Sequence, residues 1–125
     1  MSYLVQYLPR ACGPVRALRG ARVDEQTQLN RPGYYAGAYV RVFVEDTSRR
    51  RIRRGVIPSP RFALEIADCT NTIRLEFAVE TDGYRENSLF KIATLIDALQ
   101  RFEAGLHAEA ELYADRERVH SPAAV

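Results

Sequence analysis

Five arginines fall within six consecutive positions, which makes this run the densest group of side chains able to do chemistry. The run consists of Arg49, Arg50, Arg51, Arg53 and Arg54. A guanidinium group is a planar fork of donors that binds phosphate in bidentate fashion and stacks on bases. The run therefore predicts a phosphate-bearing partner. The alternative is a solvated hairpin tip that pairs with the acidic half of the chain or protects a sheet edge from aggregation.

Aromatic residues precede the arginine run and add a second kind of contact. Tyr39, Arg41 and Phe43 alternate with valines, so they share one face of a predicted strand, and Tyr34 and Tyr35 lie just upstream. Rings that stack on bases, set between cations that bind phosphates, form surfaces for single-stranded nucleic acid. The predicted binding residues are Tyr39, Arg41, Phe43, Arg49, Arg50, Arg51 and Arg53. For the two aromatic members, a second core layer or a subunit interface is the alternative.

Motifs of enzymes and of cofactor sites are missing from the sequence. We find no GxSxG sequence, no Walker loop and no GxGxxG sequence. Glu103, His107 and Glu111 recur at every fourth residue, but the zinc signature HExxH is absent, and such groups are usual on solvated helix faces. Cys12 and Cys69 are isolated in the sequence, so we expect reduced thiols. We predict a non-enzymatic protein without a metal or a cofactor.

Charge is distributed unevenly along the chain. Residues 1–60 carry eleven arginines and four acids, a net charge of +7, whereas residues 61–125 carry seven basic and twelve acidic residues, a net charge of −5. This asymmetry favours either an anionic partner for the first half or attraction between the halves, within one chain or between subunits. Lys91 is the only lysine beside 17 arginines. We take this skew as a sign of a high-GC genome, such as that of an actinobacterium or its phage.

Length and composition indicate a single globular domain. The chain has 125 residues, of which 46% are apolar and 27% charged, and domains usually contain roughly 100 to 200 residues. No apolar run reaches the roughly 18 to 20 residues of a membrane helix. Residues 1–10 lack the features of a secretory signal. We therefore expect a cytoplasmic protein with no membrane partner.

Two β-hairpins are predicted between residues 38 and 79. In the second, alternation over residues 61–79 sets Ile66 opposite Ile73, and in the same register Glu65 faces Arg74 on the other side. The same register places Leu64 opposite Leu75 and Phe62 opposite Phe77. Cys-Thr is a poor two-residue turn, so a wider loop is expected between these strands.

The first hairpin would pair residues 40–45 with residues 51–57. Val44 then faces Ile52, but Arg54 falls on the side of the valines. This misfit indicates an edge strand or a bulge near Gly55. The strand would end at the proline-rich residues 58–60, because proline cannot donate to a ladder.

A long helix is predicted over residues 86–118, with Asn87 or Ser88 as its N-cap. Apolar residues follow at spacings of three and four. Such a helix is much longer than the strands, so one small sheet cannot cover it, and its far part needs another cover. That cover is either the N-terminal segment or a second subunit, and we favour the subunit. The predicted oligomer interface consists of Leu106, Ala110, Leu112 and Tyr113.

The remaining segments show weaker patterns. Residues 1–37 read as an irregular arm in which residues 3–8 could form a short strand, and residues 120–125 read as a tail. The fold class is therefore α+β: an antiparallel meander of four or five strands followed by one long C-terminal helix packed across the sheet. We expect a small oligomeric binding module for single-stranded nucleic acid or a nucleotide. The alternative is a protein-interaction or assembly subunit, an accessory protein with a host or assembly partner and no nucleic-acid role.

Overall fold

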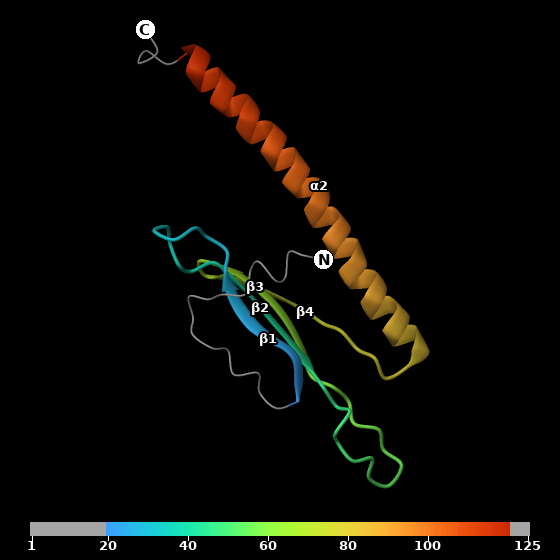
Figure 1. Cartoon of the computed structure of the whole chain (residues 1–125). Coiled ribbons are helices and arrows are strands. Elements are labelled where there is room, and N and C mark those ends of the chain that lie inside the picture. Colours follow the sequence, from blue (N-terminus) through green and yellow to red (C-terminus); the bar gives the residue numbers. More distant parts are fainter. Residues whose placement is uncertain (1–19, 121–125) are drawn as a thin grey trace. The chain divides into compact units, whose positions relative to one another are not determined.

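The computed structural model describes residues 20–120. Within them the elements are β1 (Ala21–Gln28), β2 (Tyr39–Glu45), β3 (Phe62–Asp68), β4 (Asn71–Leu75) and α2 (Asp82–His120) (Figure 1). The strands form one antiparallel sheet in the order β1-β2-β3-β4. The predicted α+β class, a meander followed by a long helix, is confirmed. The expected strand at residues 3–8 and the tail after His120 lie outside the described residues.

The hairpin of β3 and β4 has the predicted register. Ile66 pairs with Ile73, and Glu65 pairs with Arg74, whose Nε lies 3.9 Å from Glu65 Oε2. Leu64 pairs with Leu75, where β4 ends, so the expected pair of Phe62 with Phe77 is not part of the ladder. The expectation of a wider loop is wrong. Only two residues, Cys69 and Thr70, separate the paired Asp68 and Asn71, and Cys69 has a φ of 55°.

The predicted pairing of residues 40–45 with residues 51–57 is wrong. Strand β2 pairs with β3 instead, so that Val44 faces Phe62 and Val40 faces Ile66. This register gives every valine of β2 a large apolar partner, whereas the expected register set Arg54 on the valine side. Residues 46–61 form a long loop, in which the only isolated bridge joins Arg53 to Val56.

Strand β1 lies where an irregular arm was expected. Its sequence, ARVDEQTQ, is largely polar, so it lacks the apolar alternation that reveals a half-buried strand. Among the strands of residues 20–120 it is an edge strand and pairs only with β2. Ala21 pairs with Glu45 and Val23 with Val44, so Arg22 is an extra residue in the ladder. Such a bulge re-aims the local side chains, and here Arg22 Nη2 lies 3.3 Å from Asp46 Oδ1.

The sheet has one apolar face and one mixed face. The apolar face carries Val40, Val42 and Val44 of β2 with their apolar partners on β3, continued by Ile73 and Leu75 of β4. The opposite face carries polar, aromatic and small residues. Most strand residues are half-buried, and among the described residues only Ala38 and Ala67 are buried hydrophobics. The sheet therefore has a thin core.

Helix α2 has 39 residues and is about 58 Å long at 1.5 Å per residue. It begins at Asp82, earlier than expected, because the Thr81 hydroxyl accepts a hydrogen bond from the Tyr84 N–H at 3.1 Å and so serves as the N-cap. None of its residues is buried. Within residues 20–120, no helix has the length and apolar character that a membrane crossing requires. The sheet and the first turn of α2 belong to one structural unit, and the helix from Arg85 onward belongs to another. The packing of the helix across the sheet stays a prediction.

A candidate phosphate-binding loop

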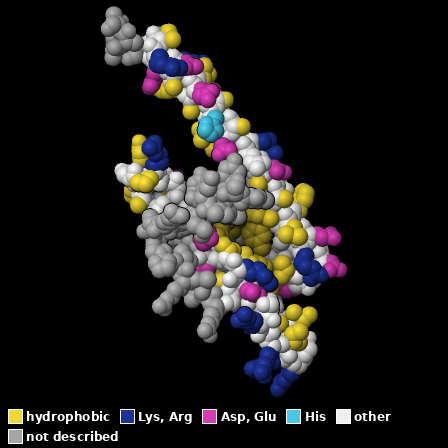
Figure 2. All heavy atoms as spheres, in the orientation of Figure 1, with side chains coloured by type: hydrophobic (Ala, Val, Ile, Leu, Met, Phe, Trp, Pro, Cys, Tyr) yellow, Lys and Arg dark blue, Asp and Glu magenta, His cyan; other side chains and the backbone are white. Residues whose placement is uncertain are grey.

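The loop of residues 46–61, which we call the arginine loop, connects β2 to β3 at one end of the sheet. It projects beyond the strands (Figure 1), and basic side chains gather on it (Figure 2). It contains six arginines and a single acid, Asp46, so its net charge is +5. The arginine run and Arg61 thus lie on one short, solvent-facing segment. Arg61 was not among the predicted binding residues, although its place between Pro60 and the strand put it near the loop.

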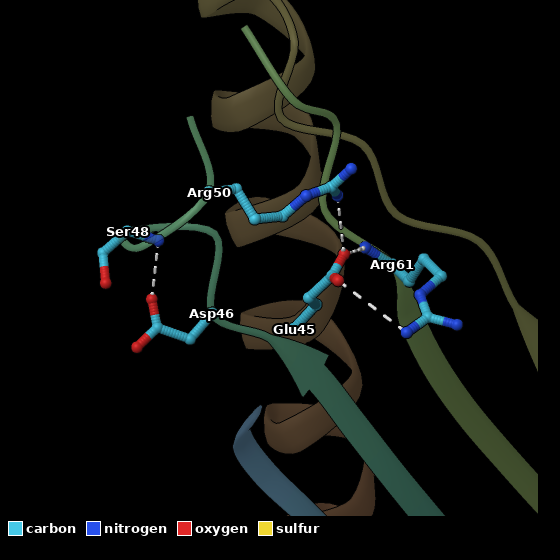
Figure 3. A network of polar contacts seen from close by, with 5 residues as sticks. All are labelled: Glu45, Asp46, Ser48, Arg50 and Arg61. Carbon is cyan, nitrogen blue, oxygen red and sulfur yellow. Dashed lines mark hydrogen bonds and ion pairs between the residues drawn. The ribbon is translucent and has the colours of Figure 1, made fainter. Parts of the chain in front are cut away.

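Glu45, the last residue of β2, holds both ends of the arginine loop (Figure 3). Its Oε1 accepts a hydrogen bond from the Arg61 N–H at 3.0 Å and lies 3.6 Å from Arg50 Nη1. Its Oε2 lies 3.7 Å from Arg61 Nη2. The Glu45 side chain is only 13% exposed, so these contacts are screened less than those at an open surface. Two of the loop arginines are therefore used to brace the loop.

Asp46 fixes the first turn of the loop. Its Oδ1 accepts a hydrogen bond from the Ser48 N–H at 2.9 Å (Figure 3). Hydrogen bonds from the Ser48 side chain and N–H lower the pKa of Asp46, helped by the positive charges of Arg22 and Arg49. The Arg50 N–H then donates to the carbonyl of Thr47 at 3.0 Å. The start of the loop is thus an ordered turn around a carboxylate that stays ionised.

A second turn lies near the middle of the loop. The Val56 N–H donates to the Arg53 carbonyl at 2.9 Å, and the two residues between them, Arg54 and Gly55, have φ values of 54° and 73°. Two consecutive positive φ angles define a type I′ turn, in which Asn-Gly is the preferred pair. Arg54 therefore occupies a position that a large side chain seldom takes. The turn places it beyond Arg53, at the bend of the chain.

Apart from Arg49, whose charge acts on Asp46, three arginines of the loop are left without an acidic partner in the described part of the chain. No carboxylate of residues 20–120 lies within ion-pair distance of Arg51, Arg53 or Arg54. An open depression of about 430 Å³ is lined by Arg50, Arg51, Arg53, Val56 and Pro58. Ile52, Val56 and Ile57 of the same loop are exposed. This combination can neutralise phosphates and contact apolar parts of a nucleotide.

The predicted binding residues on β2 have internal partners instead. The Tyr39 hydroxyl donates to Glu65 Oε1 at 2.8 Å, which raises the pKa of Tyr39. Arg41 Nη2 lies 3.9 Å from Asp24 Oδ1. The structure does bring Tyr39, Arg41 and Phe43 together on one face, as predicted. However, the two carboxylates on this face would repel phosphates.

Phe43 is the aromatic residue that meets the arginine loop. The Arg61 guanidinium carbon lies 5.7 Å from the centre of its ring, which is a cation–π distance. Tyr34 and Tyr35 belong to the loop that joins β1 to β2, at the opposite end of the sheet. They are therefore separated from the arginine loop by the length of β2, about 23 Å for seven residues. Tyr34 and Tyr35 thus lie far from the arginine loop, whereas Phe43 lies beside it.

Comparisons with known proteins find no match for this chain. No protein-family model matches the chain, and neither a curated protein nor a solved structure is a significant match. Among residues 20–120, no group of three or more His, Cys, Asp or Glu side chains is placed to hold a metal. Cys69 is exposed and has no disulfide partner.

Proposed function

We propose that the protein is a non-enzymatic binding module whose arginine loop takes a phosphate-bearing partner, with single-stranded nucleic acid as the first choice and a nucleotide as the second. The observation that carries this proposal is the contrast within the loop. Arg50 and Arg61 brace it through Glu45, while Arg51, Arg53 and Arg54 have no acidic partner among the described residues. Binding would give these three cations the counter-charges that the fold does not supply.

The binding energy would come chiefly from charge neutralisation. For a single strand, the logarithm of the binding constant falls with the logarithm of salt concentration with a slope of about −0.7 per neutralised phosphate. Three arginines then predict a contribution of about −2 to this slope. The exposed Ile52 and Val56 would contact sugars and base faces. Such contacts discriminate little between sequences, so we expect weak sequence preference.

The test is a titration of labelled single-stranded oligonucleotides at two salt concentrations. The loop variant carries Arg51→Ala, Arg53→Ala and Arg54→Ala. The control variant carries Arg22→Ala, Arg41→Ala and Arg74→Ala, which remove the same charge from arginines that are paired with acids. Circular dichroism confirms that both variants are folded.

We expect the loop variant to bind at least about tenfold more weakly than the wild type, with a salt slope reduced by about 2. The control variant should lose much less affinity for the oligonucleotide. Equal losses in the two variants would reduce the effect to net charge and contradict a site on the loop. Absence of wild-type binding at low salt would exclude the nucleic-acid proposal, and the same titration with a nucleoside triphosphate would then test the second choice.

An assembly role is the second candidate, and one observation favours it. Helix α2 exposes a row of large apolar residues, among them Leu99, Phe102 and Leu106. A nucleic-acid partner would not cover them. Exposed apolar patches of this kind are typical of protein–protein interfaces.

A further inference from the structure

Apolar residues of α2 recur along one seam with alternating spacings of three and four. Its core positions are Leu89, Ile92, Ile96, Leu99, Glu103, Leu106, Ala110, Tyr113 and Glu117. Leu95 and Phe102 flank the seam. This 3-4 spacing is the pattern by which helices pair in coiled coils. The seam runs nearly the whole helix and is interrupted only by the two glutamates.

Several seam residues are exposed to solvent. Leu89 is 70% exposed, Tyr113 65% and Leu106 58%, and Phe102 beside the seam is 69% exposed. The helix is about 58 Å long, whereas a seven-residue strand spans about 23 Å. The sheet of the same chain is therefore too short to cover the seam along its whole length, wherever it packs.

We propose that the seam is covered by the α2 helix of a second copy of this chain, in an antiparallel pair centred on Arg101. Arg101 is the midpoint of α2 (Asp82–His120), so in this register the two helices overlap along their full length. The same register superimposes the seam on itself. Ile96 meets Leu106 of the second copy, and Leu89 meets its Tyr113. Ile92 meets Ala110 of the second copy, so apolar residues face apolar residues.

Charge selects the antiparallel arrangement over the parallel one. In a parallel pair, Glu103 would face Glu103 and Glu117 would face Glu117, which is repulsive. In the antiparallel pair, Glu117 meets Arg85 of the second copy, and Glu103 lies beside Leu99 rather than another carboxylate. The net charges of the two halves of the helix favour the same antiparallel arrangement. Residues 82–101 have no net charge, whereas residues 102–120 carry a net charge of −3. Only the antiparallel pair keeps the two acidic halves apart.

The apolar area is sufficient for a stable pair. Specific interfaces bury about 1,200 to 2,000 Å² in total. Nine apolar side chains of each helix lie on the seam or flank it, so eighteen must each contribute about 70 Å² to reach the lower value. A single aromatic ring can bury about 150 to 250 Å². The predicted interface residues Leu106, Ala110 and Tyr113 belong to this seam, whereas Leu112 lies beside it.

Two measurements on the full chain test the pairing and its direction. Sedimentation equilibrium gives the dissociation constant of the wild type, of Leu106→Glu and of Glu103→Leu. We expect a wild-type dimer, a monomer for Leu106→Glu, and a dimer at least roughly tenfold tighter for Glu103→Leu, because a leucine replaces a charge in two layers. A monomeric wild type, or a dimer unaffected by Leu106→Glu, would overturn the proposal.

Disulfide cross-linking then determines the direction, in a background where Cys12 and Cys69 are replaced by serine. Gln100 flanks the seam next to the midpoint, so only the antiparallel pair brings the two copies of Gln100→Cys together. Tyr113 lies far from the midpoint, so only a parallel pair brings the two copies of Tyr113→Cys together. Cross-linking of the first variant alone supports the proposed register. Cross-linking of the second, or of neither, contradicts it.

Discussion

At the scale of single residues, Tyr39 shows how the sheet uses a group that we expected to bind bases. Its hydroxyl donates a hydrogen bond to Glu65, and this bond is the main cause of its raised pKa. The carboxylate accepts from the protonated phenol and opposes its ionisation. Because the folded state holds this proton more tightly than the unfolded chain, the contribution to stability is present below the ordinary pKa of about 10 and is lost as pH rises through the folded value.

Replacing Glu65 with glutamine should therefore lower the pKa of Tyr39 towards its ordinary value, because the charged acceptor is removed. The ultraviolet absorbance of tyrosinate during an alkaline titration measures this change, and Tyr39→Phe identifies the signal. Glu25→Gln is the control, since Glu25 pairs with Val42 and so lies on the other face of the sheet. An equal shift in Glu25→Gln would show that general charge, rather than the hydrogen bond, sets the value.

The pKa of Asp46 is shifted in the opposite direction, downwards. Its pKa is lowered chiefly by the hydrogen bond from the Ser48 side chain, then by that from the Ser48 N–H. It therefore contributes to stability above its ordinary pKa, and the contribution disappears as pH falls through the lower folded value. Ser48→Ala should raise the Asp46 pKa, measured by the carboxyl carbon shift in NMR. Ser59→Ala, elsewhere on the same loop, should leave it unchanged, and a shift there would contradict the assignment to Ser48.

At the scale of elements, the sequence predicted the β3–β4 register because two independent patterns agreed. Apolar alternation and the Glu65–Arg74 pair both excluded a slip by one residue. The sequence did not predict β1, because its residues are largely polar and show no apolar alternation. It also failed for residues 51–57, where the misplaced Arg54 was the signal that no strand forms. Local patterns cannot show that β2 prefers β3, because that choice depends on a long-range pairing.

The Arg54–Gly55 turn separates the geometry of the arginine loop from its charge. Gly55→Ala keeps every charge but places a side chain at a φ of 73°, which costs about 1 to 2 kcal/mol. Arg54→Asn removes one charge but suits the turn better. We expect Gly55→Ala to weaken oligonucleotide binding without changing the salt slope, and Arg54→Asn to reduce the slope by about 0.7. The titrations described above measure both quantities. An unchanged slope in Arg54→Asn would show that Arg54 does not contact phosphate, and a changed slope in Gly55→Ala would show that the turn alters the number of phosphate contacts.

The hairpin turn at Cys69 allows a second test of backbone strain at a positive φ, through its effect on stability. Its φ of 55° falls at the first position of a two-residue hairpin loop, where glycine is favoured. Cys69→Gly should stabilise the protein by about 0.5 to 1 kcal/mol, since relief of the backbone strain exceeds the loss of chain entropy. Urea unfolding measures this free energy. Thr70→Gly, at the neighbouring position without a positive φ, should destabilise, and stabilisation by both changes would refute the argument from φ.

At the scale of the whole molecule, the two proposals make a joint prediction. An antiparallel dimer carries two arginine loops, so a strand long enough to reach both binds the second loop at a high effective concentration. An oligonucleotide of about 8 nucleotides fits one site, whereas one of about 60 could engage two. The ratio of the two affinities therefore reports on assembly.

Leu106→Glu leaves the arginine loop intact but should separate the dimer. The gain in affinity of the long oligonucleotide over the short one should then be lost. We expect affinity for the long oligonucleotide to fall by about tenfold or more, within the range that bivalency supplies, while affinity for the short one stays the same. Fluorescence anisotropy at fixed salt measures both affinities, and the triple loop variant serves as the control because it should lose both. Equal losses for the two lengths in Leu106→Glu would mean that the helix itself contributes to the site. An unchanged ratio would mean that the two loops of the dimer cannot reach the same strand, because a bivalent gain exists only when both sites are engaged at once.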